Sequence, residues 1–227
     1  MQKYLQEVEQ TTAKTKKTVP LQRKAFKQGF SFSQLAFEQQ LDIWNYIFYK
    51  TEDYRTEMFC IYFLEYHIKE RKRMLNAWPV IKHWQDKISR WETSDAIAKV
   101  YAQLVEYKAQ LILPTYKKWN SSKNEWHRRQ SIVGLIYYAS SRKKYLPFNT
   151  ITKLIIPLLD DNAHYVQRGI GWTLKELGKL YPQEQEIFVF DHATKIAPIA
   201  YSAGTEKWDK SKREKLKEIR KAARKKV

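Results

Sequence analysis

The chain has 227 residues, of which 42 are Lys or Arg and 24 are Asp or Glu, so its formal net charge is +18. The apolar content of 43% is enough for a continuous core, and the single cysteine, Cys60, excludes an intrachain disulfide. Because the sequence has no secretory signal pattern and no long apolar run, we expect a cytoplasmic protein without a membrane segment. Its expected partner is a polyanion, above all nucleic acid.

The positive charge is concentrated at the two ends of the sequence. Residues 14–28 include six basic and no acidic residues, and residues 205–227 include eleven basic and four acidic ones, which gives +6 and +7 of the total +18. Either run alone is equally well explained as a solvated face or tail. In a chain that curves into a C shape, however, both ends would line the same groove.

Helices are predicted along the whole chain, because no segment alternates apolar and polar residues long enough to indicate a sheet. Pro20 suits the first turn of a basic helix that ends near Phe30, and Ser33 suits the cap of one that ends near Tyr49. The remaining predicted helices cover residues 51–68, 73–88, 92–109, 112–119, 124–142, 150–159, 163–180, 183–196 and 210–226. Since the connections are short, we predict one all-α domain over residues 1–227.

A helix-like segment recurs along the chain, with basic or polar residues at its start and an apolar run after them. The clearest copies cover residues 54–59, 127–132 and 166–171, and a weaker copy covers 94–97. One position recurs at steps of 39, 34 and 39 residues and is occupied in turn by Thr56, Asp95, Arg129 and Arg168. This spacing is typical of HEAT-like helical pairs, which stack into a curved solenoid with one face open to a long ligand.

Aromatic residues are abundant, with 8 Trp, 15 Tyr and 10 Phe. Most of them are expected in the core, and the apolar runs 59–64 and 136–138 are predicted to be buried layers. Tryptophans beside charged residues near helix starts are the expected exceptions.

The motifs of several common catalytic sites are missing. The sequence has no glycine-rich phosphate loop, no HExxH, no CxxC and no GxSxG, and its five histidines lack the spacing of metal ligands. We therefore expect no metal and no cofactor.

Trp91 and Asp95 form the first candidate site. Residues four apart share a helix face, so both side chains should project together. The alternative is that Glu92 and Asp95 are ordinary first-turn residues favoured by the helix dipole, with Trp91 as an N-terminal staple.

Two further segments, 124–129 and 164–172, hold the other candidates. The planar guanidinium of Arg129 suits a phosphate. Gly169 and Gly171 lack side chains, so another backbone could approach the predicted helix closely around Trp172. Each glycine inside a helix lowers helix stability by about 1 kcal/mol relative to alanine. Tight packing between neighbouring repeats would explain both glycines without a ligand.

Together these segments resemble the signature of a known family. The matching patterns are Trp91-x-x-x-Asp95, Asn124-x-Trp126-x-x-Arg129, Tyr165-Val166-Gln167-Arg168-Gly169-Ile170-Gly171-Trp172-x-Leu174-Lys175-Glu176 and Ser211-Lys212-Arg213-Glu214. They resemble the DNA alkylation repair proteins, the HEAT-like repeat DNA glycosylases, from about residue 17 to residue 219. The third pattern is specific in itself, and the others are specific through their order and spacing.

The resemblance implies a C-shaped solenoid of antiparallel helical pairs whose concave basic face binds duplex DNA. The implied reaction is hydrolysis of the N-glycosidic bond of purines alkylated at N3 or N7, without insertion of the base into a pocket. By resemblance, Asp95 stabilises the oxocarbenium sugar and positions water. Trp91 and Trp172 pack against the deoxyribose, and Arg129 holds the flanking phosphate.

The expected partner is therefore the phosphate backbone of duplex DNA, bound by a monomer. The cations expected to contact it are Lys16, Lys17, Arg23, Lys24, Arg128, Arg129, Arg168, Lys212 and Arg213.

The sequence departs from the family pattern at its start. Family members carry about two helices before a turn that resembles Thr18–Arg23, and only seventeen residues precede that turn here. One helix of the groove is thus expected to be missing. Two alternatives to a glycosylase stay open: a family member that binds bent or branched DNA without excision, and a protein-binding scaffold.

Overall fold

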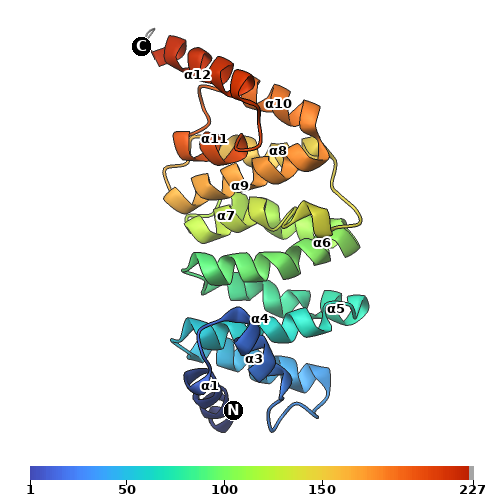
Figure 1. The fold of residues 1–227 in the computed structure, drawn as a ribbon. Helices are drawn as coiled ribbons and strands as arrows, with labels where there is room; N and C mark the ends of the chain where they lie inside the picture. Colours follow the sequence, from blue (N-terminus) through green and yellow to red (C-terminus); the bar gives the residue numbers. More distant parts are fainter. Residues whose placement is uncertain (225–227) are drawn as a thin grey trace. The chain divides into compact units, whose positions relative to one another are not determined.

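The computed structural model describes residues 1–224 and contains helices but no strand in that range (Figure 1). The all-α prediction is confirmed. The chain divides into two compact units, residues 1–100 and residues 101–227, which are described separately below. The prediction of one domain over the whole chain stays a prediction. Among the described residues, no helix is both long enough and apolar enough to span a bilayer.

Unit 1 is built around a central apolar helix, α4. Its elements are α1 (Gln2–Lys14), α2 (Val19–Lys27), α3 (Phe37–Lys50), α4 (Tyr54–His67), α5 (Arg71–Ile81), the short η1 (Lys82–Asp86) and the start of α6 (Trp91–Asn120). The α4 helix begins where the Asp53 carboxylate accepts a hydrogen bond from the backbone N–H of Arg55 at 3.0 Å.

The core of unit 1 lies where α1, α2 and α3 pack against α4. Five consecutive or nearly consecutive residues of α4 are at most 1% exposed, namely Phe59, Cys60, Ile61, Phe63 and Leu64. The buried layer predicted for residues 59–64 is therefore confirmed. Trp44 of α3 adds ring contacts to Phe63 at 5.9 Å and to Phe30 at 5.3 Å between centroids.

Two details of unit 1 differ from the sequence prediction. No helix was predicted for residues 2–14, yet α1 forms there and buries Leu5 and Val8. Ser33 does not cap α3, because its hydroxyl accepts the Phe30 N–H at 2.8 Å in a turn after Gly29. The α3 helix starts four residues later, at Phe37.

Unit 2 begins within α6, at Tyr101. Its further elements are α7 (Glu125–Val133), η2 (Ala139–Ser141), α8 (Phe148–Ile155), η3 (Ile156–Leu158), α9 (His164–Leu180), α10 (Pro182–Asp191), α11 (Pro198–Gly204) and α12 (Lys210–Arg224). A break was predicted between residues 109 and 112, and α6 breaks slightly earlier, at Lys108, which has non-helical angles of φ −156° and ψ 73°. The last two residues predicted for the final helix lie outside the described range.

The predicted helix 124–142 is wrong beyond Val133. There α7 ends at Gly134, whose carbonyl accepts a hydrogen bond from the Tyr116 hydroxyl at 3.1 Å. A Cβ atom at Gly134 would lie only 2.4 Å from that hydroxyl oxygen. The predicted buried layer 136–138 is also only partly right, since Ile136 is 2% exposed but Tyr138 is 51% exposed.

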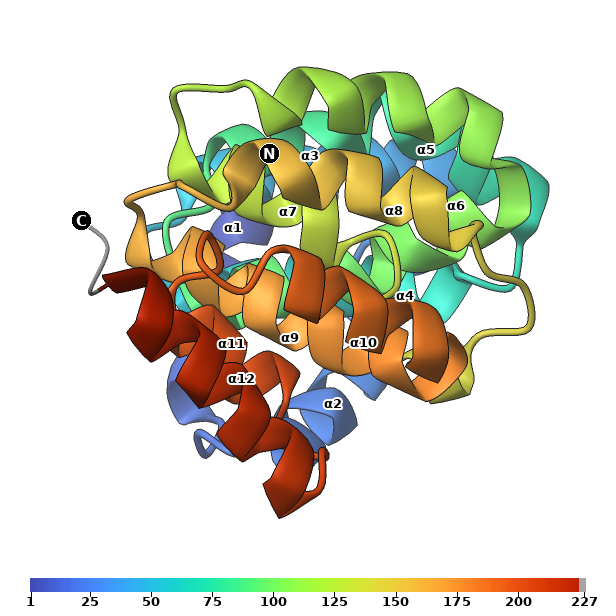
Figure 2. The ribbon, with the colours of Figure 1, turned by 90° about the horizontal axis from the view of Figure 1, so that it is seen from above.

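Helix α9 is the centre of unit 2, with α7 and α11 on either side of it (Figure 1) and α10 beside it (Figure 2). A Cβ atom at Gly171 would lie 2.7 Å from the carbonyl oxygen of Ala200 in α11, and one at Gly204 would lie 3.0 Å from Cβ of Leu174. The short helix α11, which the sequence analysis missed, therefore touches α9 nearly backbone to backbone. Tight packing, the alternative explanation of Gly171, is confirmed.

This packing predicts opposite effects for two glycines of α9. Gly171→Ala should lower the free energy of unfolding by about 2 kcal/mol, because the new methyl group overlaps the α11 backbone. Gly178→Ala should raise it by about 0.5 kcal/mol, since its Cβ atom would meet Gln185 no closer than 3.4 Å. Urea unfolding of both variants, followed by circular dichroism, checks the pair. Equal destabilisation would contradict the close contact at Gly171.

Candidate functional site

The position that recurs along the sequence falls at the same place in three helices. Asp95, Arg129 and Arg168 are each the fifth residue of their helix, in α6, α7 and α9, whereas Thr56 is the third residue of α4. Their surroundings differ. Arg129 is 6% exposed and Thr56 is fully buried, while Asp95 is half-buried and Arg168 is exposed. A shared register thus does not give a shared environment.

In unit 1 the candidate residues stand at the start of α6. Trp91 is the first residue of the helix and is 50% exposed. Asp95 follows one turn later and is half-buried, while Thr93 and Ser94 between them are buried. The segment before the helix is held by Arg90, whose guanidinium lies 4.7 Å above the Tyr54 ring. The helix start is therefore fixed while the indole remains accessible.

Arg23 was predicted to contact phosphate, and in unit 1 it already has a carboxylate partner. Its Nη2 atom lies 2.6 Å from Oε2 of Glu65, and its guanidinium lies 5.0 Å above the Tyr62 ring. Lys99 of α6 donates to the other oxygen of Glu65 at 3.1 Å. One carboxylate thus holds two cations, so this group retains one positive charge. Burial is the main reason that the pKa of Tyr62 rises to about 12.

The other predicted cations of unit 1 are exposed. Lys16 and Lys17 lie in the connection between α1 and α2, and Lys24 lies on α2. Their exposure leaves them accessible to an anionic partner.

In unit 2, Arg129 lies between α7 and α9. A Cβ atom at Gly169 would be 3.3 Å from Cγ and 3.6 Å from Nη1 of Arg129. The missing side chain at position 169 therefore provides the room in which the arginine lies. The next residue, Arg168, is exposed on α9.

Arg128 makes hydrogen bonds within the protein. Its Nε atom donates to Oδ2 of Asp161 at 2.5 Å, and its Nη1 atom donates to the carbonyl oxygens of Ser122 and Lys123 at 2.8 Å and 2.9 Å. The hydrogen bond to Asp161 raises the pKa of Arg128. These contacts hold the connections before α7 and α9, and DNA contact by Arg128 stays a prediction.

Trp172 lies one turn after Arg168 on α9 and belongs to a three-ring cluster. It stacks on Tyr137 with centroids 5.0 Å apart, and it meets Tyr138 nearly at right angles at 5.9 Å. Both tyrosines were predicted to lie in a buried layer. In the structure Tyr137 is half-buried and Tyr138 is exposed. Only the charged residues that follow them could have indicated a surface position.

The basic helix α12 packs on unit 2 through Leu216 and Arg220. Leu216 is 1% exposed, and Arg220 donates to the carbonyl oxygen of Ile196 at 2.7 Å and to that of Ala193. Of the two predicted DNA contacts, Lys212 is paired with Glu186 at 2.5 Å, which raises the pKa of Lys212, and Arg213 is half-buried. The helix α12 therefore has a packing role. Its contact with DNA stays a prediction.

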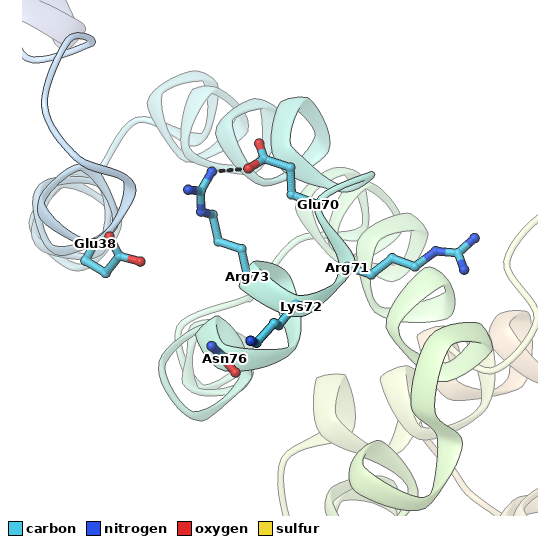
Figure 3. Close-up of a pocket in the computed structure, with 6 residues that line it drawn as sticks. All are labelled: Glu38, Glu70, Arg71, Lys72, Arg73 and Asn76. Atoms are coloured by element: carbon cyan, nitrogen blue, oxygen red, sulfur yellow. Dashed lines mark hydrogen bonds and ion pairs between the residues drawn. The ribbon is translucent and has the colours of Figure 1, made fainter.

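A pocket lined mostly by charged residues lies in unit 1 at the start of α5 (Figure 3). It measures about 430 Å³ and is lined by Glu38, Glu70, Arg71, Lys72, Arg73 and Asn76. Glu70 pairs with Arg73 across its rim. None of the predicted site residues lines it, and its mixed charges indicate no particular ligand. Within residues 1–224, no cluster of His, Cys, Asp or Glu is arranged to hold a metal ion.

The Arg128–Asp161 pair gives a stability prediction. Asp161→Asn should lower the free energy of unfolding by about 2 kcal/mol, because it leaves a largely buried arginine without its counter-charge. The matched control is Glu214→Gln, which breaks the exposed pair with Lys217 and should change nothing measurable. Thermal or urea unfolding checks both. An unchanged Asp161→Asn protein would mean that Arg128 is available for another partner.

Solved structures of similar fold come from two bacteria. A predicted DNA alkylation repair enzyme of Enterococcus faecalis has a TM-score of 0.67 at 18% identity, covering 85% of this chain and 87% of that one. AlkD2 of Streptococcus mutans has a TM-score of 0.64 at 17% identity, covering 90% and 97%. The protein smu.31 of Streptococcus mutans UA159 has a TM-score of 0.63 at 18% identity, covering 91% and 100%. At these identities the likeness shows the fold alone.

Sequence comparison gives the family. No curated protein sequence matches the chain. The family model described as DNA alkylation repair enzyme, however, matches residues 1–208, which is most of the chain. This match agrees with the repeat register, the helical fold and the four-part signature described above. The chain belongs to the DNA alkylation repair enzyme family.

Proposed function

We propose that this protein is a cytoplasmic, monomeric DNA-binding protein that hydrolyses the N-glycosidic bond of purines alkylated at N3 or N7. The observation that carries the proposal is the pair at the start of α6, a half-exposed Trp91 with Asp95 one turn later. Family membership and the net charge of +18 support the choice of DNA as the partner.

The chemistry suits a carboxylate beside an aromatic ring. A purine alkylated at N3 or N7 is cationic and leaves readily, and positive charge grows on the sugar as the glycosidic bond breaks. The Asp95 carboxylate would stabilise that charge and position the attacking water. The exposed indole of Trp91 would cover the apolar side of the deoxyribose. This mechanism uses side chains alone.

In unit 2, taken by itself, the residues proposed to contact DNA are Trp172, Arg168 and Arg129. Trp172 stacks on the Tyr137 ring and is half-buried, and its exposed part would pack against a deoxyribose. Arg168, one turn earlier, is exposed and would contact a phosphate. Arg129 is confined between α7 and α9, so that its guanidinium would hold the phosphate beside the lesion from a fixed position.

DNA binding without excision is the alternative, and the paired cations favour it. Arg23 is bound to Glu65 and Arg128 to Asp161, and Arg129 is only 6% exposed. A protein whose arginines are paired with carboxylates in this way would bind DNA through exposed lysines such as Lys16 and Lys17. It would make fewer contacts to the damaged nucleotide. A protein-binding scaffold is the third candidate.

Substitution of the carboxylate tests the reaction. With duplex DNA containing 7-methylguanine and enzyme in excess, the wild type should release the base, and Asp95→Asn should slow release about 100-fold or more. The measurement is single-turnover formation of abasic sites.

The matched control is Glu92→Gln, which removes the neighbouring carboxylate of the same helix turn. It should release the base at the wild-type rate, because Glu92 lies 3.7 Å from Arg90 and is assigned no role in the reaction. Wild-type protein that binds the duplex but releases no base would favour the alternative without excision. Equal rates for Asp95→Asn and wild type would remove Asp95 from the mechanism.

Salt dependence tests the mode of binding. The logarithm of the duplex affinity should fall linearly with the logarithm of salt concentration, by about 0.9 for each phosphate contact. The double variant Lys16→Gln/Lys17→Gln should therefore reduce the slope by about 2, whereas Lys50→Gln, on the last turn of α3, should leave it unchanged. Fluorescence anisotropy at several salt concentrations measures the slopes. An affinity independent of salt would favour the scaffold.

A further inference from the structure

Tyr138 has a backbone conformation that tyrosine rarely adopts. Its φ is +48°, and among the described residues it is the one non-glycine residue with positive φ. The left-handed region is disfavoured for bulky side chains and is normally occupied by glycine or asparagine. A residue kept in that region needs support from its surroundings, and such positions concentrate at functional sites.

The surrounding turn supplies that support. The buried carboxylate of Glu176, in α9, accepts the Ala139 N–H at 2.8 Å. The Tyr138 carbonyl accepts the N–H and the hydroxyl of Ser141 at 2.9 Å and 2.8 Å. The Tyr145 hydroxyl donates to the carbonyl of Ala139 at 3.0 Å. Glu176, a residue of the family signature without an assigned role, thus fixes the turn that presents Tyr138.

The fixed turn leaves the ring of Tyr138 accessible. The side chain is 51% exposed although it belongs to an ordered cluster. Tyr137 meets it at 84° and Trp172 at 88°, so neither neighbour lies flat on the Tyr138 ring. A tyrosine with a purely internal packing role would be buried. This one is held in place while much of its surface remains open.

Positive charge accompanies the ring. Lys143 and Lys144 are exposed further along the same loop, and Arg168 is exposed on α9 one turn before Trp172. The nearby acidic groups are engaged, since Glu106 accepts the Lys143 N–H and Glu176 pairs with Lys179. An accessible aromatic ring among cations is the arrangement by which proteins hold unpaired nucleotides, with bases stacked on rings and phosphates bound by lysine or arginine.

We propose that Tyr138 is a stacking platform for an unpaired nucleobase, with Lys143 and Lys144 on the adjoining phosphates. This inference rests on the proposed DNA binding and extends it, because bases within an intact duplex are already stacked and offer no free face. The bound structure would be single-stranded DNA or a duplex with an unpaired base. Glu176 acts as a positioning residue, through the turn that carries Tyr138.

The deciding variant is Tyr138→Gly, which removes the ring and also relieves the positive φ. It should unfold at nearly the same temperature as the wild type, so that lost binding cannot be ascribed to unfolding. Its affinity for a labelled single-stranded oligothymidylate should fall about 10-fold. Its affinity for a fully paired duplex should change less than 2-fold. Tyr138→Phe, which keeps the ring, should bind both DNAs like the wild type.

Stacking itself is read with 2-aminopurine, whose fluorescence is quenched when an aromatic ring lies against it. The wild type and Tyr138→Phe should quench it in a single strand, and Tyr138→Gly should not. Equal quenching by Tyr138→Gly and wild type would overturn the inference, as would a wild type that binds duplex without quenching 2-aminopurine. In the latter case the proposed DNA binding would stand. Quenching without release of 7-methylguanine would instead support the inference and remove the proposed reaction.

Discussion

The close approach of α9 to its two neighbours is the constraint on which unit 2 depends. Gly171 lets the α11 backbone come within contact distance, and Gly169 leaves the space that Arg129 occupies. Each glycine inside a helix costs about 1 kcal/mol relative to alanine, and close packing offsets this cost. Because the same helix carries Arg168 and Trp172, the packing of its glycine face determines where the polar and aromatic face points.

The parts of the fold that could be predicted from sequence are those set by local pattern. The run of apolar residues in α4 indicated a buried layer, and separate helices were predicted for residues 92–109 and 112–119, near the break within α6. The register of Asp95, Arg129 and Arg168 within their helices also followed from the repeat. These features depend on residues close in the chain, and all of them appear in the structure.

The parts of the fold that were predicted wrongly depend on contacts between residues far apart in the sequence. The end of α7 is set by the contact of Tyr116 with Gly134, and the turn at Tyr138 by the hydrogen bond from Ala139 to Glu176. No local pattern marks either contact. For the same reason, counting charges identified Arg23 and Arg128 as cations but could not reveal their carboxylate partners. The net charge of +18 thus predicts the class of partner better than it predicts which residue meets a phosphate.

The central claim is that Trp91 and Asp95, at the start of α6, contact the damaged nucleotide of a DNA duplex. The most direct test is ¹⁹F NMR of protein labelled with 5-fluorotryptophan, with the Trp91 resonance assigned by Trp91→Phe. On titration with duplex DNA containing a tetrahydrofuran abasic analogue, this resonance should shift, and undamaged duplex should shift it less. An unchanged resonance, or equal shifts with both DNAs, would contradict the account.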